Sequence, residues 1–362
     1  MMPAAKLSFF YSGKGDTILL RASCGKARPD DWALIDCCLT EDSGADVRIR
    51  NVIADEKITK LKFVCLTHPH RDHYLGMRRL LKGHFYDKAT GCLKVDEFWD
   101  SGVNFEVLAA IAESTGTSEV KKEIDELYKD FLVRLILANK LVQCPMYTGT
   151  LSTITFGDFH LLSLSPRFNR VKRFNLRGVS KALGISRGPV KYRYEEINDL
   201  SVILVLMHKT LPVNIVLGAD ATADAWVEAL DAWAKVLKKL DRGKSRFAAV
   251  KVSHHGAAAS LHPSLYEDYC WAKKTVAILT VGPGDSNHPH QDVLDLLHSR
   301  NIRTYATCWP TATPVPAKPH MPLPGFGASK VGQLRGHDWA DIDVIVEQTG
   351  RLKVVPGKSR IL

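Results

Sequence analysis

Thr67-His68-Pro69-His70-Arg71-Asp72-His73 is the stretch of sequence that decides the fold, because it places four potential metal-binding side chains within six residues. It directly follows Leu61–Leu66, an apolar run typical of a buried strand. A loop at the end of such a strand lies at one edge of a sheet, where open α/β proteins place their sites. The first two imidazoles can reach one metal ion, and the Asp and His that follow can reach a second about 3.5–4 Å away. Three neutral nitrogens and a carboxylate suit zinc, and also manganese or iron, so we predict a metal site here.

Composition indicates a soluble globular protein of 362 residues, with 45% hydrophobic and 24% charged residues. No apolar run reaches the roughly 18 residues of a membrane span, and the N-terminal apolar stretch is too short for a signal peptide. The eight cysteines show no C-x-x-C spacing, which favours free thiols in a reducing cytoplasm. We therefore expect a cytoplasmic protein that contacts no membrane. The net charge of +10 is compatible with a polyanionic partner.

Strand and helix patterns alternate along the chain, which predicts two packed sheets with helices outside. The expected strands are Lys6–Tyr11, Thr17–Ala22, Trp32–Cys37, Leu61–Leu66, Val95–Trp99, Leu151–Phe156, Phe159–Ser165, Ser201–Met207, Asn214–Gly218, Ala248–Val252, Val276–Val281, Asp341–Val346 and Leu352–Val355. The expected helices are Tyr74–Lys82, Phe105–Glu113, Glu119–Leu141, Ala223–Leu240, Pro263–Ala272 and Gln291–Arg300. No linker divides the chain, so we predict a single domain over residues 1–362. Its insertions are helical at about 103–147 and a basic loop at 167–197, and a Pro-rich C-terminal extension covers 309–340.

Three later strands also end in polar residues. Asp220 follows the first, His254 and His255 follow the second, and His288 comes after the third. A single strand-end Asp is more often a turn former than a ligand. The carboxyl ends of neighbouring parallel strands meet at one edge of a sheet, however, so these side chains should converge with the first cluster.

The order and spacing of these segments resemble the metallo-β-lactamase fold, and within it the hydrolase domain of the ComEC competence-protein family, from about Ser12 to Leu297. His68 to His73 is that family's H-x-H-x-D-H motif in full. The other matching segments are Gly13-Lys14-Gly15-Asp16, Leu34-Ile35-Asp36, Asn198-Asp-Leu-Ser201, Gly218-Ala-Asp220, Lys251-Val-Ser-His-His-Gly256 and Asn287-His288-Pro289-His290. Cys37 and Cys38 replace the usual glycines, and Ala219 replaces another. The resemblance implies an α/β fold, a four-layer αββα sandwich.

The resemblance also implies two divalent metal ions, zinc or manganese, and a ligand set for them. His68 and His70 would hold the first ion, Asp72 and His73 the second, and Asp220 would bridge both. His254 is assigned as a further ligand, and His255 is placed beside Asp72 and His288 among the catalytic residues. The sequence leaves open which of the two adjacent histidines binds metal. Asp36 would orient a ligand imidazole.

Many relatives carry a third histidine for the first metal between the H-x-H-x-D-H motif and the bridging aspartate. Here His160 stands inside a strand pattern, and His84 and His208 are the other histidines of that interval. We expect this ligand to be absent or replaced by another group or water, so the occupancy of both metal positions stays open.

The expected chemistry is hydrolysis by a metal-bound hydroxide, because two cations lower the pKa of a bound water and polarise a phosphoryl oxygen. The segment 167–193 favours a phosphodiester substrate, since its cations lie among aromatic residues that can stack on bases. The expected nucleic-acid-binding residues are Arg167, Arg170, Lys172, Arg173, Arg177, Lys181, Arg187, Lys191 and Arg193. The resemblance points the same way, because the ComEC domain is regarded as a DNA nuclease.

We therefore predict a metal-dependent nuclease or phosphodiesterase, with DNA the favoured partner. Two alternatives remain. One is a metal-binding scaffold that recognises nucleic acid with little or no catalysis. The other is a phosphodiesterase for a small substrate, such as a cyclic nucleotide or a phosphocholine ester. The sequence does not distinguish DNA from RNA, or endonuclease from exonuclease action.

Overall fold

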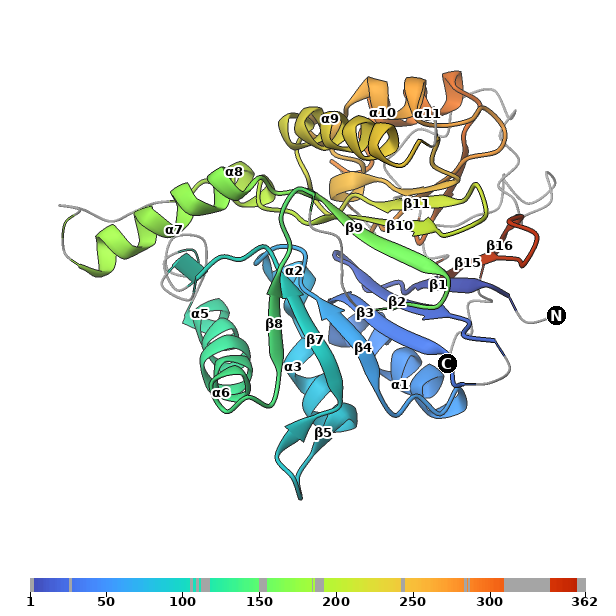
Figure 1. Cartoon of the computed structure of the whole chain (residues 1–362). Coiled ribbons are helices and arrows are strands. Elements are labelled where there is room, and N and C mark those ends of the chain that lie inside the picture. The colour runs from blue at the N-terminus through green and yellow to red at the C-terminus, as the bar shows by residue number, and fades with distance from the viewer. Residues whose placement is uncertain are drawn as a thin grey trace.

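The computed structural model describes residues 3–25, 28–104, 107–108, 111, 118–149, 155–183, 185, 192–241, 245–282, 285, 287–308 and 339–356. Within these residues the chain forms two large sheets packed face to face, with helices on both outer faces (Figure 1). The predicted four-layer αββα sandwich is thus confirmed. No helix among the described residues is both long and apolar enough to cross a membrane.

The first sheet has eight described strands in the order β16-β15-β1-β2-β3-β4-β7-β8. Its bounds are β1 Ala5–Phe9, β2 Thr17–Ala22, β3 Asp31–Cys37, β4 Leu61–Cys65, β7 Val95–Asp100, β8 Val142–Pro145, β15 Ile342–Val346 and β16 Leu352–Pro356. The strands β3, β4, β7 and β8 are parallel, so the ends of β3 and β4 lie at the same edge. A small hairpin, β5 Tyr86–Asp87 and β6 Cys92–Leu93, stands apart.

The second sheet has the order β14-β13-β12-β11-β10-β9. Its bounds are β9 Phe159–Ser165, β10 Ile203–His208, β11 Asn214–Leu217, β12 Ala249–Lys251, β13 Val276–Leu279 and β14 Arg303–Ala306. The strands β11 to β14 are parallel, which brings the ends of β11, β12 and β13 together.

Side chains alternate along the strands and so divide the interior into three apolar layers. On β4, Phe63 faces the second sheet, whereas Val64 faces the helices. On β10, Leu204 packs between the sheets, and Val205 packs under the helix that carries Trp226. Each sheet is thus buried on both faces, which explains why its parallel strands read as continuous apolar runs.

The helices flank the two sheets. Over the first sheet lie α1 Ala45–Asp55, α2 Arg71–Tyr74, α3 Met77–Leu80, α5 Ser118–Ile124 and α6 Val133–Leu137, with a π-helical stretch at Asp125–Leu132 joining the last two. Over the second lie α9 Ala223–Lys239, α10 Pro263–Asp268 and α11 Gln291–Ser299. Two further helices, α7 Phe168–Ala182 and α8 Tyr194–Asn198, form an arm that projects from the sandwich (Figure 1).

The arm corrects one expectation. Residues 168–182 of the expected basic loop form a 15-residue helix. Val171 and Phe174 are buried on one of its faces, and a side chain at Gly178 would collide with Val107, so this face packs against the segment before α5. Helix α1 and strand β8 were also not anticipated. The expected strand Leu151–Phe156, the helix Phe105–Glu113 and the 309–340 extension lie largely outside the described residues.

Candidate metal centre

The loop after β4 delivers the first group of polar side chains to the sheet edge. His68, His70 and His73 are at most 5% exposed, although a histidine loop would normally be solvated. His68 Nε2 lies 3.1 Å from His70 Nδ1, so two ring nitrogens already converge. Helix α2 begins at Arg71 and turns Asp72 and His73 back toward the same region.

The second sheet supplies the opposing group. Asp220 follows β11 and is fully buried, and His254 and His255 follow β12. Both histidines adopt left-handed backbone conformations, with φ of 48° and 54°. Two successive non-glycine residues in this region are strained, and such strain is found mainly at functional sites.

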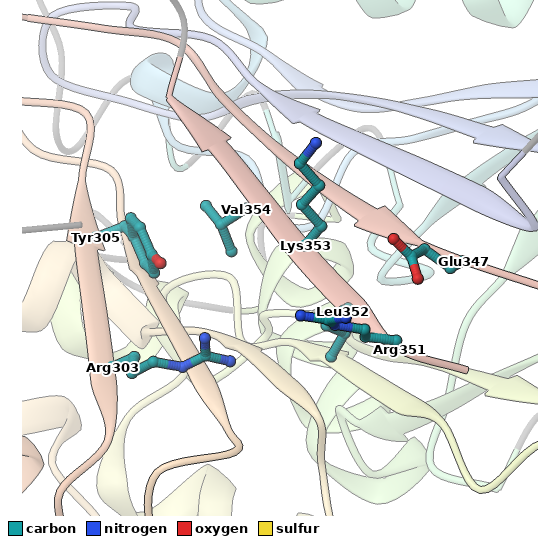
Figure 2. A pocket seen from close by; sticks show the side chains of 7 residues that line it. All are labelled: Arg303, Tyr305, Glu347, Arg351, Leu352, Lys353 and Val354. Carbon is teal, nitrogen blue, oxygen red and sulfur yellow. The ribbon is translucent and has the colours of Figure 1, made fainter. Parts of the chain in front are cut away.

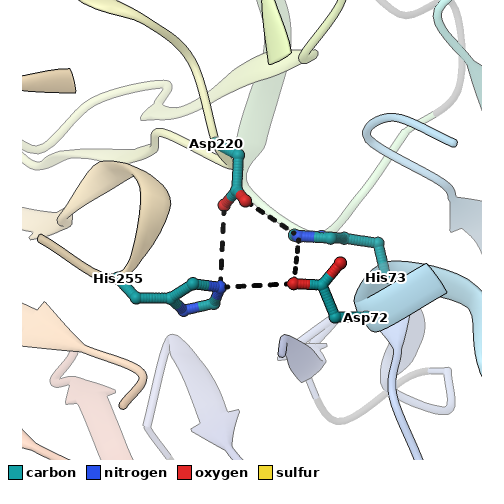
Figure 3. A group of neighbouring side chains, drawn as sticks. All are labelled: Asp72, His73, Asp220 and His255. Carbon is teal, nitrogen blue, oxygen red and sulfur yellow. Dashed lines mark ion pairs between the residues drawn. The ribbon is translucent and has the colours of Figure 1, made fainter. Parts of the chain in front are cut away.

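Asp72, His73, Asp220 and His255 form one compact cluster in which a ligand atom of each lies within 4.8 Å of the others (Figure 3). His73 Nε2 is 3.3 Å from Asp220 Oδ2, and His255 Nε2 is 3.9 Å from Asp220 Oδ1. Asp72 Oδ2 completes the cluster at 3.7 Å from His255 Nε2. The structure therefore brings together two carboxylates and two imidazoles from both sheets.

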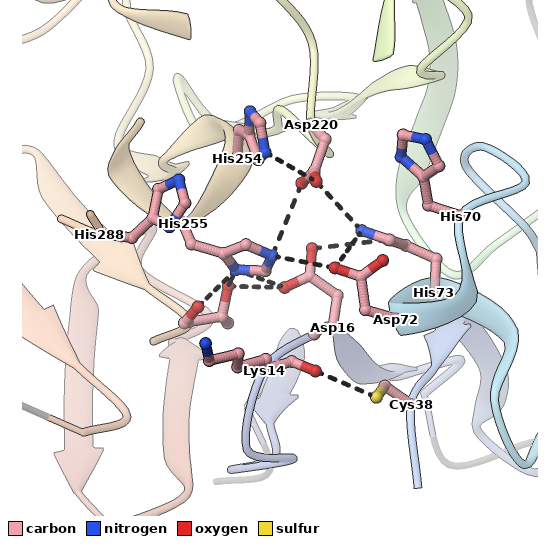
Figure 4. Close-up of polar contacts among 12 residues, drawn as sticks. Lys14, Asp16, Cys38, His70, Asp72, His73, Asp220, His254, His255 and His288 are labelled. Atoms are coloured by element: carbon pink, nitrogen blue, oxygen red, sulfur yellow. Dashed lines mark hydrogen bonds and ion pairs between the residues drawn. The ribbon is translucent and has the colours of Figure 1, made fainter. Parts of the chain in front are cut away.

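Two of the remaining expected ligands lie around the same carboxylate, and the third, His70, contacts His68. His68 Nε2 and His254 Nε2 are each 3.8 Å from Asp220 Oδ2. Asp220 is thus the centre of the whole arrangement, with imidazoles of both sheets around it (Figure 4).

Several buried polar atoms of the cluster have no hydrogen-bond partner within the described residues. They are both carboxylate oxygens of Asp220, Nε2 of His73 and Nε2 of His255. Leaving such atoms unsatisfied is costly, and a shared bound cation would satisfy all of them. Oxygen and imidazole nitrogen are ligands that zinc and manganese accept. The residues present therefore fit divalent metal ions.

Supporting groups fix the orientation of the imidazoles. The Nδ1–H of His73 donates to Asp36 Oδ2 at 2.7 Å, so its Nε2 faces Asp220. Asp36 also accepts hydrogen bonds from the backbone N–H and the hydroxyl of Thr67, and this ties it to the metal loop. His255 Nδ1 donates to the carbonyl of Thr280, which likewise leaves its Nε2 directed at the cluster.

The surroundings of the centre shift the pKa values of its histidines and of Asp72. Burial lowers the pKa of His68 well below its usual value and that of His70 to about 4, so both imidazoles are neutral. Burial acts on His73 and His255 in the same direction, but the attraction of Asp220 outweighs it and raises their pKa. For Asp72, burial is outweighed mainly by His73, and its pKa falls to about 2.

His288 stands at the edge of the centre, not among the ligand atoms. Its ring centroid is 5.3 Å from that of His254, and its Nδ1 is 3.2 Å from Asp285 Oδ2 (Figure 4). Lys14 Nζ lies 3.9 Å from the same carboxylate oxygen and is largely exposed. A cation, a carboxylate and an imidazole therefore lie together beside the centre.

The three histidines between His73 and Asp220 take other positions. His84 Nε2 pairs with Arg50, His160 is exposed on β9, and His208 Nδ1 accepts hydrogen bonds from the turn after β10. None of them belongs to the described cluster.

Some of the expected nucleic-acid-binding residues form ion pairs within the protein, and others are exposed on α7. Arg167 and Arg170 form ion pairs with Glu228 of α9, and Arg170 also pairs with Asp199 at 2.6 Å. Arg177 pairs with Glu196 and lies over the Tyr192 ring, and Arg193 also pairs with Glu196. Lys172 and Arg173 are exposed on α7. Arg187, Lys191 and the side chain of Lys181 lie outside the described residues.

A separate cleft of about 420 Å³ lies between the edge strands β14 and β16 (Figure 2). Its lining includes Arg303, Tyr305, Glu347 and Arg351. Arg303 begins β14, whereas the histidines follow the opposite ends of the parallel strands. The cleft is therefore distinct from the metal centre.

Asp16, Lys251 and Thr280 are parts of the centre that sequence reasoning did not assign to the site. The Lys251 ammonium contacts Asp16 Oδ2, and the Thr280 hydroxyl donates to Asp16 Oδ1 at 2.6 Å. Asp16 and Lys251 stand inside the Gly13–Asp16 and Lys251–Gly256 motifs, so their position in the motifs was a usable signal.

Comparison with known proteins gives one family and distant structural likenesses. Residues 14–140 match the family model of the metallo-beta-lactamase superfamily. No curated protein matches the sequence. A diphosphatase of the PhnP family is 12% identical, over 80% of this chain and 90% of its own, with a TM-score of 0.37.

Two further solved structures are similarly distant. A beta-lactamase domain protein from Burkholderia ambifaria is 13% identical, over 65% of this chain and 63% of its own, with a TM-score of 0.34. A long form RNase Z from yeast is 10% identical, over 77% of this chain and 38% of its own, with a TM-score of 0.32. The family model does not single out the ComEC family.

Proposed function

We propose that this chain, which contains a metallo-beta-lactamase superfamily domain, is a metal-dependent hydrolase that cleaves a phosphodiester of a nucleic acid or nucleotide. The observation that carries the proposal is the ring of buried imidazoles around the unsatisfied carboxylate of Asp220. Imidazoles from both sheets lie 3.3–3.9 Å from the oxygens of this one carboxylate, an arrangement typical of the ligands of a metal site.

Divalent ions bound at this point would make a water more acidic and polarise a phosphoryl oxygen. Asp72 is the ligand residue most open to solvent, with a side chain 27% exposed, so its carboxylate can orient the attacking water. His255 belongs to the ligand cluster in this assignment, because its Nε2 faces Asp72 and Asp220. His288, held by Asp285, is then the group placed to give a proton to the leaving oxygen.

A phosphodiester substrate is supported by positive charge near the centre. Lys14 lies 3.9 Å from the carboxylate of Asp285, which also contacts His288, and the chain carries a net charge of +10. The arm also joins the centre at its base, since Asn198 at the end of α8 lies 3.4 Å from His254 Nδ1. Lys172 and Arg173 on α7 are therefore the cations of the arm that we assign to phosphate contacts.

A cleavage assay tests the proposal. Metal-stripped protein is resupplied with Zn²⁺ or Mn²⁺ and incubated with labelled single-stranded and duplex DNA and RNA, with Asp72→Asn as control. We expect metal-dependent cleavage that the substitution abolishes while substrate binding persists. If no polymer and no small phosphodiester is cleaved, the protein is a binding scaffold and the proposal is wrong.

A second candidate is hydrolysis of a small phosphodiester such as a cyclic nucleotide. It is favoured by the ion pairs of Arg167, Arg170 and Arg177, which leave less free charge on the arm for a polymer. The double substitution of Lys172 and Arg173 by Gln separates the two candidates. For a polymer substrate it should weaken binding and reduce the salt slope by about 2. An unchanged slope would favour the small substrate.

A further inference from the structure

The first metal position has no histidine from the interval between His73 and Asp220, and the sequence does not say which ion His254 would bind. His68 Nε2, His70 Nδ1 and Asp220 would hold this ion, and the interval from His73 to Asp220 supplies no further described histidine to the centre. Zinc in proteins is usually four-coordinate, so a fourth group is needed from water or from elsewhere in the chain. The question is whether the structure offers such a group.

His254 lies where that group is needed. Its Nε2 is 3.8 Å from Asp220 Oδ2, the same oxygen and the same distance as for His68 Nε2. In Figure 4, His254 approaches Asp220 from the side opposite to His70. Neighbouring ligands of a tetrahedral zinc lie about 3.3 Å apart, given bonds of about 2.0–2.1 Å. The distance from His254 Nε2 to Asp220 Oδ2 is thus about half an ångström longer than the spacing of two zinc ligands, as it is for His68.

The backbone explains how two adjacent histidines serve one centre. In an extended strand, His254 and His255 would point to opposite faces. Their left-handed conformations instead direct both rings to the sheet edge, where Nε2 of each lies near a different oxygen of Asp220. The ring centroids are 6.2 Å apart, which separates two ligand positions.

The other ring nitrogen of His254 has support typical of a metal ligand. Its Nδ1 lies 3.4 Å from the Asn198 amide nitrogen and from the Ser260 hydroxyl. Asn198 is buried, and its Oδ1 has no hydrogen-bond partner within the described residues. Because amide oxygen and nitrogen are assigned by hydrogen bonding, exchanging them satisfies Oδ1 with the Nδ1–H of His254. Nε2 then carries the lone pair that faces the centre.

We propose that His254 replaces the missing histidine of the first metal position, while His255 completes the second. The first ion would have His68, His70, His254 and Asp220, and the second would have Asp72, His73, His255 and Asp220. The inference rests on the proposed metal-dependent function, but it makes a separate statement about how many ions each variant holds.

Metal content tests it without reference to activity. Wild type, His254→Gly, His255→Gly and His288→Gly are stripped, saturated with Zn²⁺ or Mn²⁺, freed of excess ion and analysed by mass spectrometry. Glycine adopts the left-handed conformation without strain, so the first two variants should keep the local backbone. His254→Asn, whose residue also tolerates this conformation, serves as a second variant.

We expect two ions per chain in wild type and in His288→Gly, and one in His254→Gly and in His255→Gly. Loss in the two single variants should be additive, with no ion retained by the double variant. If His254→Gly and His254→Asn still hold two ions, the inference is wrong and the hydrolase proposal stands. The same holds if wild type binds a single ion and both His254 variants retain it. A wild-type chain that binds no ion would overturn both.

Discussion

Lys251 is a buried lysine beside the metal centre, and its ammonium group lies between two carboxylates. It contacts Asp16 Oδ2, lies 3.8 Å from Asp220 Oδ1 and donates to the carbonyl of Ala219. Burial alone would lower its pKa, but Asp16 and Asp220 outweigh burial and raise it. The lysine is therefore charged and balances carboxylates that the protein interior would otherwise destabilise.

Replacing Lys251 by Met should destabilise the metal-free protein by on the order of 3–5 kcal/mol, because Asp16 loses its buried partner. Denaturant unfolding in the presence of a chelator measures this. Lys14→Met is the matched control at the same edge, since its side chain is 66% exposed and its removal should change stability little. Equal unfolding midpoints for the two variants would contradict the assigned role of Lys251.

Asp100, at the end of β7, predicts a pH dependence of stability that is independent of metal. Burial raises its pKa to about 6, although Gly102 N–H and the Gln143 amide donate to it. The folded state thus holds the proton more tightly than the unfolded state, whose Asp pKa is about 3.9. The resulting stabilisation is present at low pH and is lost as the pH rises through about 6.

Wild type should therefore lose on the order of 2–3 kcal/mol relative to Asp100→Asn between about pH 4 and pH 7. Asn cannot ionise, and it keeps one carbonyl oxygen as an acceptor. Unfolding curves of both proteins across this range give the difference. Parallel pH profiles would show that Asp100 titrates normally in the folded state.

At the scale of elements, the turn between β1 and β2 supports the metal loop. The backbone N–H of Asp16 donates to the Asp72 carbonyl at 3.1 Å, and Gly15 lies in the gap with a φ of +133°. A Cβ atom at Gly15 would come within 2.3 Å of the Asp72 carbonyl oxygen. Only glycine fits this close contact between turn and loop.

Gly15→Ala should destabilise the fold by on the order of 2 kcal/mol or more, and it should weaken metal binding because Asp72 must move. Gly25→Ala is the matched control: its φ is +77°, but no atom lies within 4 Å of an added Cβ. It should cost only backbone strain, about 1–2 kcal/mol, and leave metal affinity unchanged. Calorimetric metal titration of both variants provides the comparison. Equal metal affinities of the two variants would show that the turn does not hold the metal loop in place.

The elements differ in how far the sequence predicts them. Buried strands such as β4 and β10 were predictable because their apolar runs stop at turn residues. Helix α7 was not, because its many cations obscured the helical spacing of Val171, Phe174 and Gly178. The convergence of Asp72 and Asp220 was predicted from strand ends that meet at one edge of a sheet, but the two residues follow strands of different sheets, and the packing of the sheets brings them together. The different directions of the His254 and His255 side chains could not be predicted, because they depend on a left-handed backbone conformation that histidine does not favour.

On the scale of the whole molecule, the centre lies at one end of the sandwich, where segments that follow strands of both sheets meet. Its ligands come from the loop after β4 in one sheet and from the segments after β11 and β12 in the other. Protonated imidazoles and Lys251 oppose the carboxylates in the metal-free centre. An ion bound there would therefore link the two halves of the sandwich.

Metal binding should consequently stabilise the fold as a whole, and chelation should lower the Tm. Because only the folded state assembles ligands from both sheets, an ion at 100 times its Kd adds about 2.7 kcal/mol per site. Differential scanning calorimetry of wild type with metal and with chelator measures the shift. Asp220→Asn should show little shift, since it removes the carboxylate common to both positions. A wild-type Tm unaffected by chelation would mean that the imidazoles and carboxylates pair by proton sharing alone, and metal would then have no part in joining the sheets.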